Sequence, residues 1–323
     1  MSNEAVGTIV KGVGGLYTVR LTASPLHPVG TLLSCRARGS FRHAHTSPLP
    51  GDEVTVLLTA EGEGEHPRRE KDGGAGSVIW EIHPRTNALI RPPIANLNYL
   101  FITMAAAAPD PILATVDKLI AIGEFNSIEP VIVITKRELN PSYARQLEEL
   151  YSLCGFSCFS VSAVSGEGIS ALEAWMADHL PNRISAFAGA SGIGKSTLMN
   201  RLFPHLSLST SEISRKIERG KHTTRQVELF PLSEDAQCGY IADTPGFSML
   251  DFERFDFFEK DDLPRTMREF LPYLGDCRYT KCSHTKEEGC AILRAVQEGH
   301  IPPSRHESYL ELYEILKNKK KWN

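Results

Sequence analysis

The sequence has few cysteines, no long apolar run and no excess of positive charge. Seven cysteines occur among 323 residues without paired, regular spacing, which argues against a disulfide framework and for a reducing cytoplasm. No apolar run is long enough to span a membrane, and the first residues lack the basic segment and apolar core of a secretory signal. The 35 lysines and arginines face 39 aspartates and glutamates, so the net charge of −4 excludes a globally basic nucleic-acid coat but not a local basic patch.

The composition describes a folded chain of several domains. Apolar residues make up 41% and charged residues 23%, enough to bury substantial cores, and the length favours two or three domains. The pattern of apolar and polar residues changes twice along the chain. It predicts a β-rich domain at 1–88, an α/β domain at 89–258 and a helical domain at 259–323. We expect a cytoplasmic monomer with no membrane attachment.

The first domain has the pattern of a small β-barrel. Tyr17, Val19 and Leu21 alternate with polar residues, and Val54 and Val56 do the same further on, as half-buried strands do. Glycine- and proline-rich turn signals separate these runs. Several short strands within about eighty residues suggest a barrel of the OB type, although an SH3-like barrel would give a similar pattern.

The second domain alternates apolar runs with helical stripes. Leu113, Val116 and Ile120 fall at helical spacing between two of the runs. Such alternation predicts a mostly parallel sheet with helices on both faces. The apolar runs are Leu100–Thr103, Val131–Ile134, Phe159–Val161, Ile184–Ala188, Val227–Leu229 and Tyr240–Ala242.

A complete phosphate-binding loop follows the run Ile184–Ala188. The segment reads Gly-Ala-Ser-Gly-Ile-Gly-Lys-Ser before an expected helix, which is the context that the G-x-x-x-x-G-K-S motif requires. Its glycines let backbone N–H groups turn around a phosphate, and the helix N-terminus adds its positive dipole. We expect Lys195 to reach the β and γ phosphates and Ser196 to ligate Mg²⁺. The predicted nucleotide contacts here are Gly189, Ala190, Ser191, Gly192, Ile193, Gly194, Lys195, Ser196 and Thr197.

Two later segments complete the phosphate side of the predicted site. Asp243-Thr-Pro-Gly246 follows an apolar run, so we expect Asp243 to hold Mg²⁺ through water and the Gly246 N–H to sense the γ-phosphate. The loop that contains His222 and Thr224 stands where a first switch loop would, and we predict Thr224 as its magnesium ligand. Because Gly246 leads directly toward the C-terminal domain, nucleotide state could be relayed mechanically to that domain.

Two segments ahead of the phosphate loop have the pattern that reads guanine. The segment Thr135–Glu138 (Thr-Lys-Arg-Glu) follows one apolar run, and Ser162-Ala163 follows the next. Glu138 would accept two hydrogen bonds from the guanine edge, the stem of Lys136 would cover the base, and the Ser162-Ala163 backbone would donate to the guanine O6. Glutamate is one methylene longer than the usual aspartate, which moves the carboxylate by about 1.5 Å unless the loop adjusts.

The guanine-reading segments precede the phosphate loop, which reverses the order of an ordinary GTPase. Because the termini of a compact α/β domain often lie close together, moving the chain break preserves the fold. The order therefore predicts a circularly permuted P-loop GTPase domain.

The last domain holds a predicted structural zinc site. Cys277, Cys282, His284 and Cys290 fall within 14 residues, where random placement would give about 0.3 cysteines. Three cysteines and one histidine are a standard tetrahedral zinc set and leave no position open for catalysis. A helix with one apolar face is expected after this cluster, over Glu307–Lys317.

Together, the barrel, the permuted order and the C-x4-C-x-H-x5-C cluster closely resemble the RsgA (YjeQ) family of small-subunit-dependent GTPases. The resemblance covers essentially the whole chain. It implies hydrolysis of GTP to GDP on the small ribosomal subunit late in its maturation, contacts with 16S rRNA by both outer domains, and GTP or GDP, Mg²⁺ and one Zn²⁺ as cofactors. The landmarks are Cys35–Arg42, Arg91–Asn96, Gly189–Thr197, Lys221–Thr224, Asp243–Phe247 and the cysteine cluster.

RNA binding also has a basis in the residues themselves. Arg36, Arg38 and Arg42, with Phe41 among them, combine positive charge with a stacking surface in the expected barrel. The lysines at the C-terminus offer further contacts to phosphate.

The predicted catalytic residues are Lys195, Thr224 and His222. Many GTPases place a glutamine after D-x-x-G to orient the attacking water, but Phe247 stands at that position here. A phenyl ring cannot bond a water in that way, so we expect slow turnover by the free protein, with His222 as the candidate to take over this role.

Two other interpretations stay open at this point. One is a P-loop ATPase or kinase acting on a small molecule, against which Thr135–Glu138 with Ser162-Ala163 argues. The other is an RNA-binding zinc protein with weak nucleotide turnover, against which the intact Lys195 and Asp243 argue.

Overall fold

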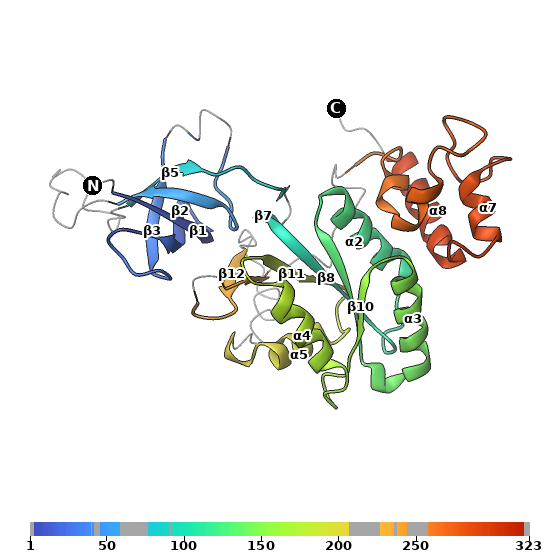
Figure 1. Ribbon diagram of the computed structural model, residues 1–323, viewed down its shortest axis with the longest axis horizontal. Helices are drawn as coiled ribbons and strands as arrows, with labels where there is room; N and C mark the ends of the chain where they lie inside the picture. The colour runs from blue at the N-terminus through green and yellow to red at the C-terminus, as the bar shows by residue number, and fades with distance from the viewer. Residues whose placement is uncertain are drawn as a thin grey trace, which may run out of the picture. The chain divides into compact units, whose positions relative to one another are not determined.

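A computed structural model describes residues 3–39, 41, 46–58, 77–90, 92–206, 227–235, 238–243 and 258–319 (Figure 1). The chain forms two compact units, which we describe separately. The first unit comprises Met1–Asn98, Ala177–Ala186 and Ser211–Gly246, and the second comprises Tyr99–Met176, Phe187–Thr210 and Phe247–Asn323.

The first unit begins with a closed five-stranded barrel. Its strands pair in the order β1-β2-β3-β5-β4, and β4 pairs back onto β1. All of these ladders are antiparallel except β3–β5. This closure confirms the predicted OB-type barrel. The strands are β1 (Glu4–Val13), β2 (Leu16–Ala23), β3 (Leu32–Ala37), β4 (Glu53–Leu57) and β5 (Ser77–Ile82).

The barrel core comes from the alternation seen in the sequence. Val19 and Leu21 on β2 and Val54 and Val56 on β4 are fully buried in one apolar cluster. Because side chains alternate across a strand, their neighbours lie on the outer face of the barrel. One of these neighbours, Arg20, is nevertheless buried, and the contacts that bury it are described below.

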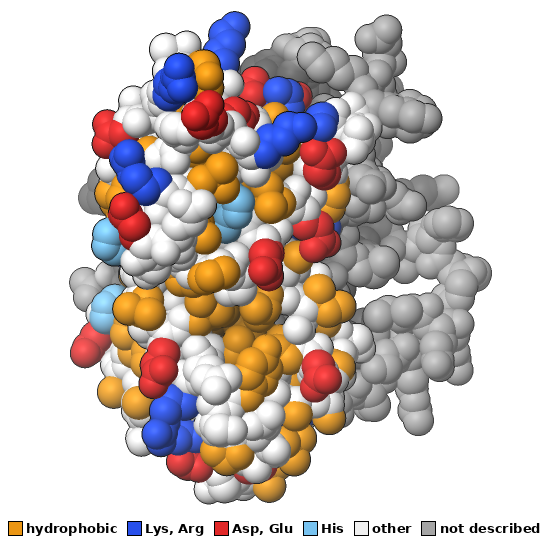
Figure 2. All heavy atoms as spheres, turned by 90° about the vertical axis from the view of Figure 1, so that its right-hand side faces the viewer, with side chains coloured by type: hydrophobic (Ala, Val, Ile, Leu, Met, Phe, Trp, Pro, Cys, Tyr) orange, Lys and Arg blue, Asp and Glu red, His pale blue; other side chains and the backbone are white. Residues whose placement is uncertain are grey.

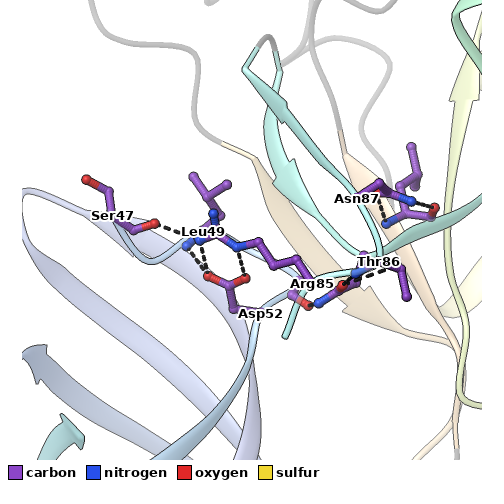
Figure 3. Close-up of polar contacts among 9 residues, drawn as sticks. Ser47, Leu49, Asp52, Arg85, Thr86 and Asn87 are labelled. Carbon is purple, nitrogen blue, oxygen red and sulfur yellow. Dashed lines mark hydrogen bonds and ion pairs between the residues drawn. The ribbon is translucent and has the colours of Figure 1, made fainter. Parts of the chain in front are cut away.

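Hydrogen bonds of Asp52, Arg85 and Asn96, which we call the clasp, join the barrel to the chain that follows it. Arg85 Nε and Nη2 donate to the two carboxylate oxygens of the fully buried Asp52 at 2.6 and 2.7 Å (Figure 3). Asn96 accepts from the Thr86 N–H and donates to the Gly51 carbonyl, both at 2.9 Å. Gly51 has a φ of +93°, and a Cβ there would lie 2.0 Å from a backbone carbonyl oxygen, so the turn requires glycine. The landmark residue Asn96 thus ties the end of the clasp to the barrel.

A hairpin of the first unit, β12–β13, continues the barrel sheet. β12 (Glu228–Pro231) pairs antiparallel with β13 (Tyr240–Asp243). β13 also pairs in parallel with the first residues of β11 (Ile184–Ala188), and β12 meets β1 where Lys11 lies opposite Glu228. The hairpin is therefore continuous with the barrel on one side and with the strand that precedes the phosphate loop on the other.

The second unit contains a parallel sheet between two layers of helices. Its strands pair in the order β10-β9-β8, and both ladders are parallel. Figure 1 shows α2 and α3 on one side of β10 and α4 and α5 on the other. This arrangement confirms the predicted α/β fold. The elements are β8 (Leu97–Ala105), α2 (Leu113–Phe125), β9 (Glu129–Thr135), α3 (Pro141–Leu153), β10 (Ser157–Ser160), α4 (Ile169–His179) and α5 (Lys195–Leu202).

The parallel strands are buried because helices cover them. Residues 130–135 of β9 are all buried, and Phe101 on β8 stacks on Phe187 with ring centroids 4.7 Å apart. Val116 and Ile120 of the predicted helical stripe are buried on α2. Since parallel strands end at the same edge, the loops after β8, β9, β10 and β11 gather there, where open α/β sheets bind ligands.

The C-terminal module of the second unit is helical, as predicted. Its elements are two 3-10 segments, Leu263–Thr266 and Arg268–Tyr273, followed by α7 (Ala291–Gln297) and α8 (Pro303–Lys317). α8 begins before the predicted Glu307, because a proline is favoured in the first helical turn. No helix in the described part of the chain is long and apolar enough to cross a bilayer.

A buried ion-pair cluster attaches this module to α2. The Arg305 guanidinium on α8 bonds Asp117 on α2 and donates to Glu269 Oε1 at 2.6 Å. The three side chains are 0%, 1% and 4% exposed, and the Tyr151 hydroxyl adds a 2.9 Å hydrogen bond to Asp117. Burial raises the pKa of Asp117, and the adjacent Arg305 opposes that shift. One guanidinium thus pairs with two carboxylates in an interior where each charge alone would be costly.

Removing the cation from this cluster should destabilise the second unit. We expect Arg305→Leu to lower the free energy of unfolding by about 3 kcal/mol or more, because two buried carboxylates lose the cation that pairs with both. The control Lys317→Leu removes an exposed 2.9 Å pair with Glu314 on the same helix and should cost less than about 1 kcal/mol. Urea unfolding followed by circular dichroism measures both. Equal midpoints for the two variants would contradict the prediction.

Candidate functional site

The phosphate loop is shaped by glycines at its two ends. Gly189 has a φ of +147°, and a Cβ there would lie 2.4 Å from the Thr103 carbonyl oxygen on β8. The Thr103 hydroxyl also donates to the Ala188 carbonyl at 2.6 Å, which fixes β8 against the start of the loop. At the other end, Gly194 adopts a φ of +90° as the residue before α5. The loop thus turns sharply between β11 and α5, in the strand–loop–helix geometry of a phosphate site.

The side chains of this loop are arranged around its backbone. Lys195 Nζ lies 3.5 Å from the Gly189 carbonyl oxygen, so the lysine crosses the mouth of the loop. Residues 190–192 are exposed, and Ser196 is half-buried in the first turn of α5. Exposed backbone N–H groups, an ammonium group and a helix N-terminus together suit an anionic phosphate chain.

Two side chains from the end of β9 hold the phosphate loop. The Thr135 hydroxyl lies within hydrogen-bond distance of the Met104 carbonyl, at 3.0 Å, and also bonds the Ile193 carbonyl of the loop. Lys136 Nζ donates to the Gly192 carbonyl at 2.7 Å and to the Ala108 carbonyl. The structure therefore brings the predicted base-reading segment directly against the predicted phosphate loop.

The rest of the base-reading set lies at the same edge of the sheet. Glu138 is exposed in the 3-10 turn Arg137–Leu139 that follows β9. Ser162 is fully buried after β10, and Ala163 is partly exposed beside it. The Arg137 N–H donates to the Val161 carbonyl at 3.2 Å, which fastens one segment to the other. A carboxylate and a short backbone loop thus lie next to the lysine that contacts the phosphate loop.

Part of the predicted nucleotide set lies outside the described residues. His222, Thr224, Gly246 and Phe247 are in this group. Of Asp243, the backbone is described, and it forms the last residue of β13.

The four predicted metal ligands are gathered into one cluster. His284 Nδ1 lies 3.6 Å from Cys277 Sγ and 3.5 Å from Cys290 Sγ, and these two sulfurs are 4.0 Å apart. The ligand atoms of all four residues, including Cys282, lie within 4.8 Å of one another. Zinc bonds of about 2.3 Å to sulfur and 2.0 Å to nitrogen give tetrahedral edges of roughly 3.5–3.8 Å. The donor set and its spacing therefore fit tetrahedral zinc.

No pattern in the sequence pointed to the residues that support this cluster. The Glu287 carboxylate accepts from the backbone N–H groups of Ser283 and Thr285 at 2.7 and 3.0 Å. From α8, the Tyr309 hydroxyl donates to the Ser283 carbonyl at 2.7 Å, and His306 Nε2 donates to the His284 carbonyl at 2.8 Å. Burial alone would raise the pKa of Glu287, but the hydrogen bonds that it accepts hold that pKa at about 2. The loop that carries the ligands is thus braced by a carboxylate that stays charged.

The outer face of the barrel carries a cation stacked on an aromatic ring. The Arg38 guanidinium carbon lies 3.8 Å from the Trp80 ring centroid, and Trp80 is 41% exposed. β3 and β5 pair with Arg36 opposite Val78, so Arg38 and Trp80 follow two residues later on the same face. Phe41 instead packs, half-buried, against the barrel core. The exposed aromatic residue of this face is therefore Trp80, which the sequence pattern did not single out.

The chain resembles known proteins over nearly its whole length. The RsgA GTPase family model matches residues 82–253, and the RsgA N-terminal domain model matches residues 6–65. The chain is 38% identical over 316 residues to the small ribosomal subunit biogenesis GTPase RsgA of Caldanaerobacter subterraneus subsp. tengcongensis, which covers 98% of this chain and 97% of the relative. The protein of the same name from Enterococcus faecalis is 36% identical over 318 residues, covering 97% of this chain and 96% of the relative.

Two solved structures share the fold. YjeQ from Thermotoga maritima aligns with a TM-score of 0.78 at 28% identity, over 98% of this chain and all (100%) of that chain. YloQ, described as a circularly permuted GTPase, aligns with a TM-score of 0.73 at 29% identity, over 99% of this chain and 97% of that chain.

The braced metal loop yields a prediction for Glu287. We expect Glu287→Gln to weaken zinc binding about tenfold, because an amide offers one acceptor oxygen where the carboxylate offers two. The adjacent Glu288 is a matched control, since its side chain is 89% exposed and lies 3.7 Å from Arg278; Glu288→Gln should bind zinc as the parent does. Competition with a chromophoric chelator measures both affinities. A similar affinity for both variants would show that the brace does not matter.

Proposed function

The chain belongs to the RsgA family of GTPases, and on that premise we propose that it hydrolyses GTP on the small ribosomal subunit and acts in the late maturation of that subunit. The observation that supports this best is the junction of Thr135 and Lys136 with the phosphate loop. It makes one continuous surface from the exposed loop backbone to Glu138 and the Ser162-Ala163 backbone. The phosphate oxygens of a guanine nucleotide would accept from the N–H groups of the loop, and the N–H groups of its base would donate to Glu138.

The proposed nucleotide contacts follow from this surface. The backbone of 189–197 would hold the phosphates, with Lys195 against the β and γ groups. Ser196 and Thr224 would hold Mg²⁺, with Asp243 acting through water, and the ion would neutralise charge on the phosphate oxygens. Gly246 would sense the γ-phosphate.

The base would be read at the ends of β9 and β10. Glu138 would accept from the two N–H donors of guanine, and the stem of Lys136, which the Gly192 and Ala108 carbonyls orient, would cover the ring. The Ser162-Ala163 backbone would donate to O6. Because Glu138 is exposed in a short turn, its longer side chain has room to meet the base.

Hydrolysis requires that a water molecule be oriented beside the γ-phosphate. Phe247 cannot orient it, so we propose that His222 does so when its loop is ordered by the subunit. The free protein would therefore be slow, and docking on rRNA would supply the missing order.

Steady-state turnover with and without purified small subunits tests the proposed function. We expect a large stimulation by the subunit, competition by GTP far above that by ATP, and loss of nucleotide binding or turnover in Lys195→Ala. His222→Ala should lower the stimulated rate much more than it lowers GTP affinity. Equal turnover with and without subunits, or equal competition by ATP, would refute the proposal.

We also propose that the barrel face around Arg38 and Trp80 contacts 16S rRNA. Arg36 and Arg38 supply charge for phosphates, and Trp80 supplies a ring on which a base can stack. Acidic and basic residues are nearly balanced both in 1–88 and in 259–323, so net charge does not separate the two outer domains. On the face shown in Figure 2, acidic and basic side chains are interspersed. The stacked pair of Arg38 and Trp80 therefore makes the barrel the first candidate for the RNA contact, with the zinc module, held by Cys277, Cys282, His284 and Cys290, as the second.

The proposal for the whole chain keeps the expected division at 1–88, 89–258 and 259–323, in a cytoplasmic monomer. In this division the barrel docks on RNA, the central part turns over GTP, and the zinc module has a structural metal.

Trp80 provides a test of the barrel contact. We expect Trp80→Ala to weaken binding to small subunits about tenfold, because stacking on an aromatic ring is worth about 1–3 kcal/mol per base. Trp80→Phe keeps a ring and should restore most of the affinity. Co-sedimentation with subunits at fixed salt measures both variants. If Trp80→Ala binds as tightly as Trp80→Phe, this face does not stack on RNA.

A further inference from the structure

The β12–β13 hairpin connects the two segments that respond to the γ-phosphate in the proposed function. β12 starts at Glu228, four positions after Thr224, and β13 ends at Asp243, three positions before Gly246. A shift of this hairpin therefore moves the start of one segment and the end of the other. Whatever holds the hairpin therefore holds the described ends of β12 and β13, to which both segments are joined.

Arg20 on β2 of the barrel binds the turn of this hairpin through hydrogen bonds. Its Nη2 donates to the carbonyls of Glu234 and Asp235 at 2.9 and 3.2 Å, and its Nη1 reaches Cys238 Sγ and the Tyr240 hydroxyl at 3.3 and 3.4 Å. The arginine is only 5% exposed although it points out of the barrel. A guanidinium buried in this way is held by its acceptors, so the barrel and the hairpin turn move together.

The hairpin is also fastened along its two edges. Lys11 on β1 lies opposite Glu228, and their side chains form a 2.7 Å ion pair. On the other edge, the Tyr240 N–H donates to the Arg183 carbonyl at 2.8 Å. A Cβ at Gly239 would lie 2.1 Å from the Leu180 carbonyl oxygen, so the hairpin packs closely on the segment that leads into β11. The barrel is thus linked through the hairpin to the strand that ends at the phosphate loop.

We propose that Arg20 is a positioning residue through which the barrel controls the nucleotide-responsive segments. This inference rests on the proposed function. A barrel docked on rRNA fixes the hairpin through Arg20, and the hairpin fixes the segments that carry Thr224 and Gly246. Arg20 touches neither nucleotide nor RNA in this scheme.

Such a coupling must act in both directions. If docking of the barrel favours the GTP-bound arrangement, GTP must by the same free energy tighten the binding of the subunit. An arginine that merely stabilised the barrel would have no effect on this difference between nucleotide states. The difference in subunit affinity between the two states is therefore the decisive measurement.

The test compares Arg20→Met with the parent protein at full length. Methionine keeps much of the length and apolar contact of the side chain but none of its hydrogen bonds. We expect basal GTP turnover and GTP affinity to be unchanged, and stimulation at saturating subunits to fall about tenfold. The ratio of subunit affinities with a non-hydrolysable GTP analogue and with GDP should also fall toward one. In contrast, Arg36→Met should weaken subunit binding equally in both nucleotide states.

A charge swap provides a second test that does not depend on how Arg20→Met folds. Lys11→Glu places two carboxylates opposite each other and should reduce the stimulation about threefold, since such half-exposed pairs are worth up to about 1 kcal/mol. Adding Glu228→Lys restores the pair and should restore the stimulation. A single variant as strongly stimulated as the parent, or a double variant that restores nothing, overturns the inference.

The outcomes separate this inference from the proposed function. If the parent protein is not stimulated by subunits, the proposed function fails, and the inference fails with it. If the parent is stimulated and Arg20→Met retains both its stimulation and its affinity ratio, the inference alone is wrong. It is also wrong if Arg20→Met binds subunits more weakly by the same factor in both nucleotide states.

Discussion

The hydrogen bonds from Thr135 and Lys136 to the carbonyls of Ile193 and Gly192 hold the two halves of the proposed nucleotide site together. They join loops that lie 58 and 56 positions apart in the chain, and neither bond depends on which loop comes first. A permuted order therefore leaves the junction intact, because it moves only the connections between elements. The predicted base-reading segment and the phosphate loop are therefore in contact, even though the sequence presents them in reverse.

The parts that could be predicted from the sequence are specified by residues close together in the chain. The phosphate loop and the zinc ligands are compact motifs, and the strands and helices have clear periods. Several of the contacts that could not be predicted act over long separations: Arg305 meets Asp117 across 188 positions, and Arg20 meets the Glu234 carbonyl across 214. Periodicity cannot show that an arginine is buried, because only the folded chain brings its acceptors together. Trp80 was missed since its partner Arg38 is distant in the sequence and directly follows a different strand, β3.

The position of Gly246 in the sequence suggests a relay toward the C-terminal module. Within the second unit, however, that module is anchored on α2 by the buried Arg305 cluster, and Arg268 adds 2.6 Å pairs to Glu124 and Glu129. α2 carries none of the proposed nucleotide contacts. A module held by buried charges on such a helix is suited to stay fixed while the nucleotide changes, since separating those charges would cost several kcal/mol.

The barrel is attached differently, through the clasp and through the β12–β13 hairpin, both within the first unit. The clasp of Asp52, Arg85 and Asn96 fixes it to the chain that enters β8, and Arg20 fixes it to the β12–β13 hairpin. A barrel held only by the clasp could turn without moving the hairpin. In the coupling that we propose, the clasp keeps the barrel attached to the chain that enters β8. A rotation of the docked barrel is then passed to the hairpin through Arg20. The permuted order makes this possible by placing the barrel ahead of β8 in the chain while the sheet pairs it with β12.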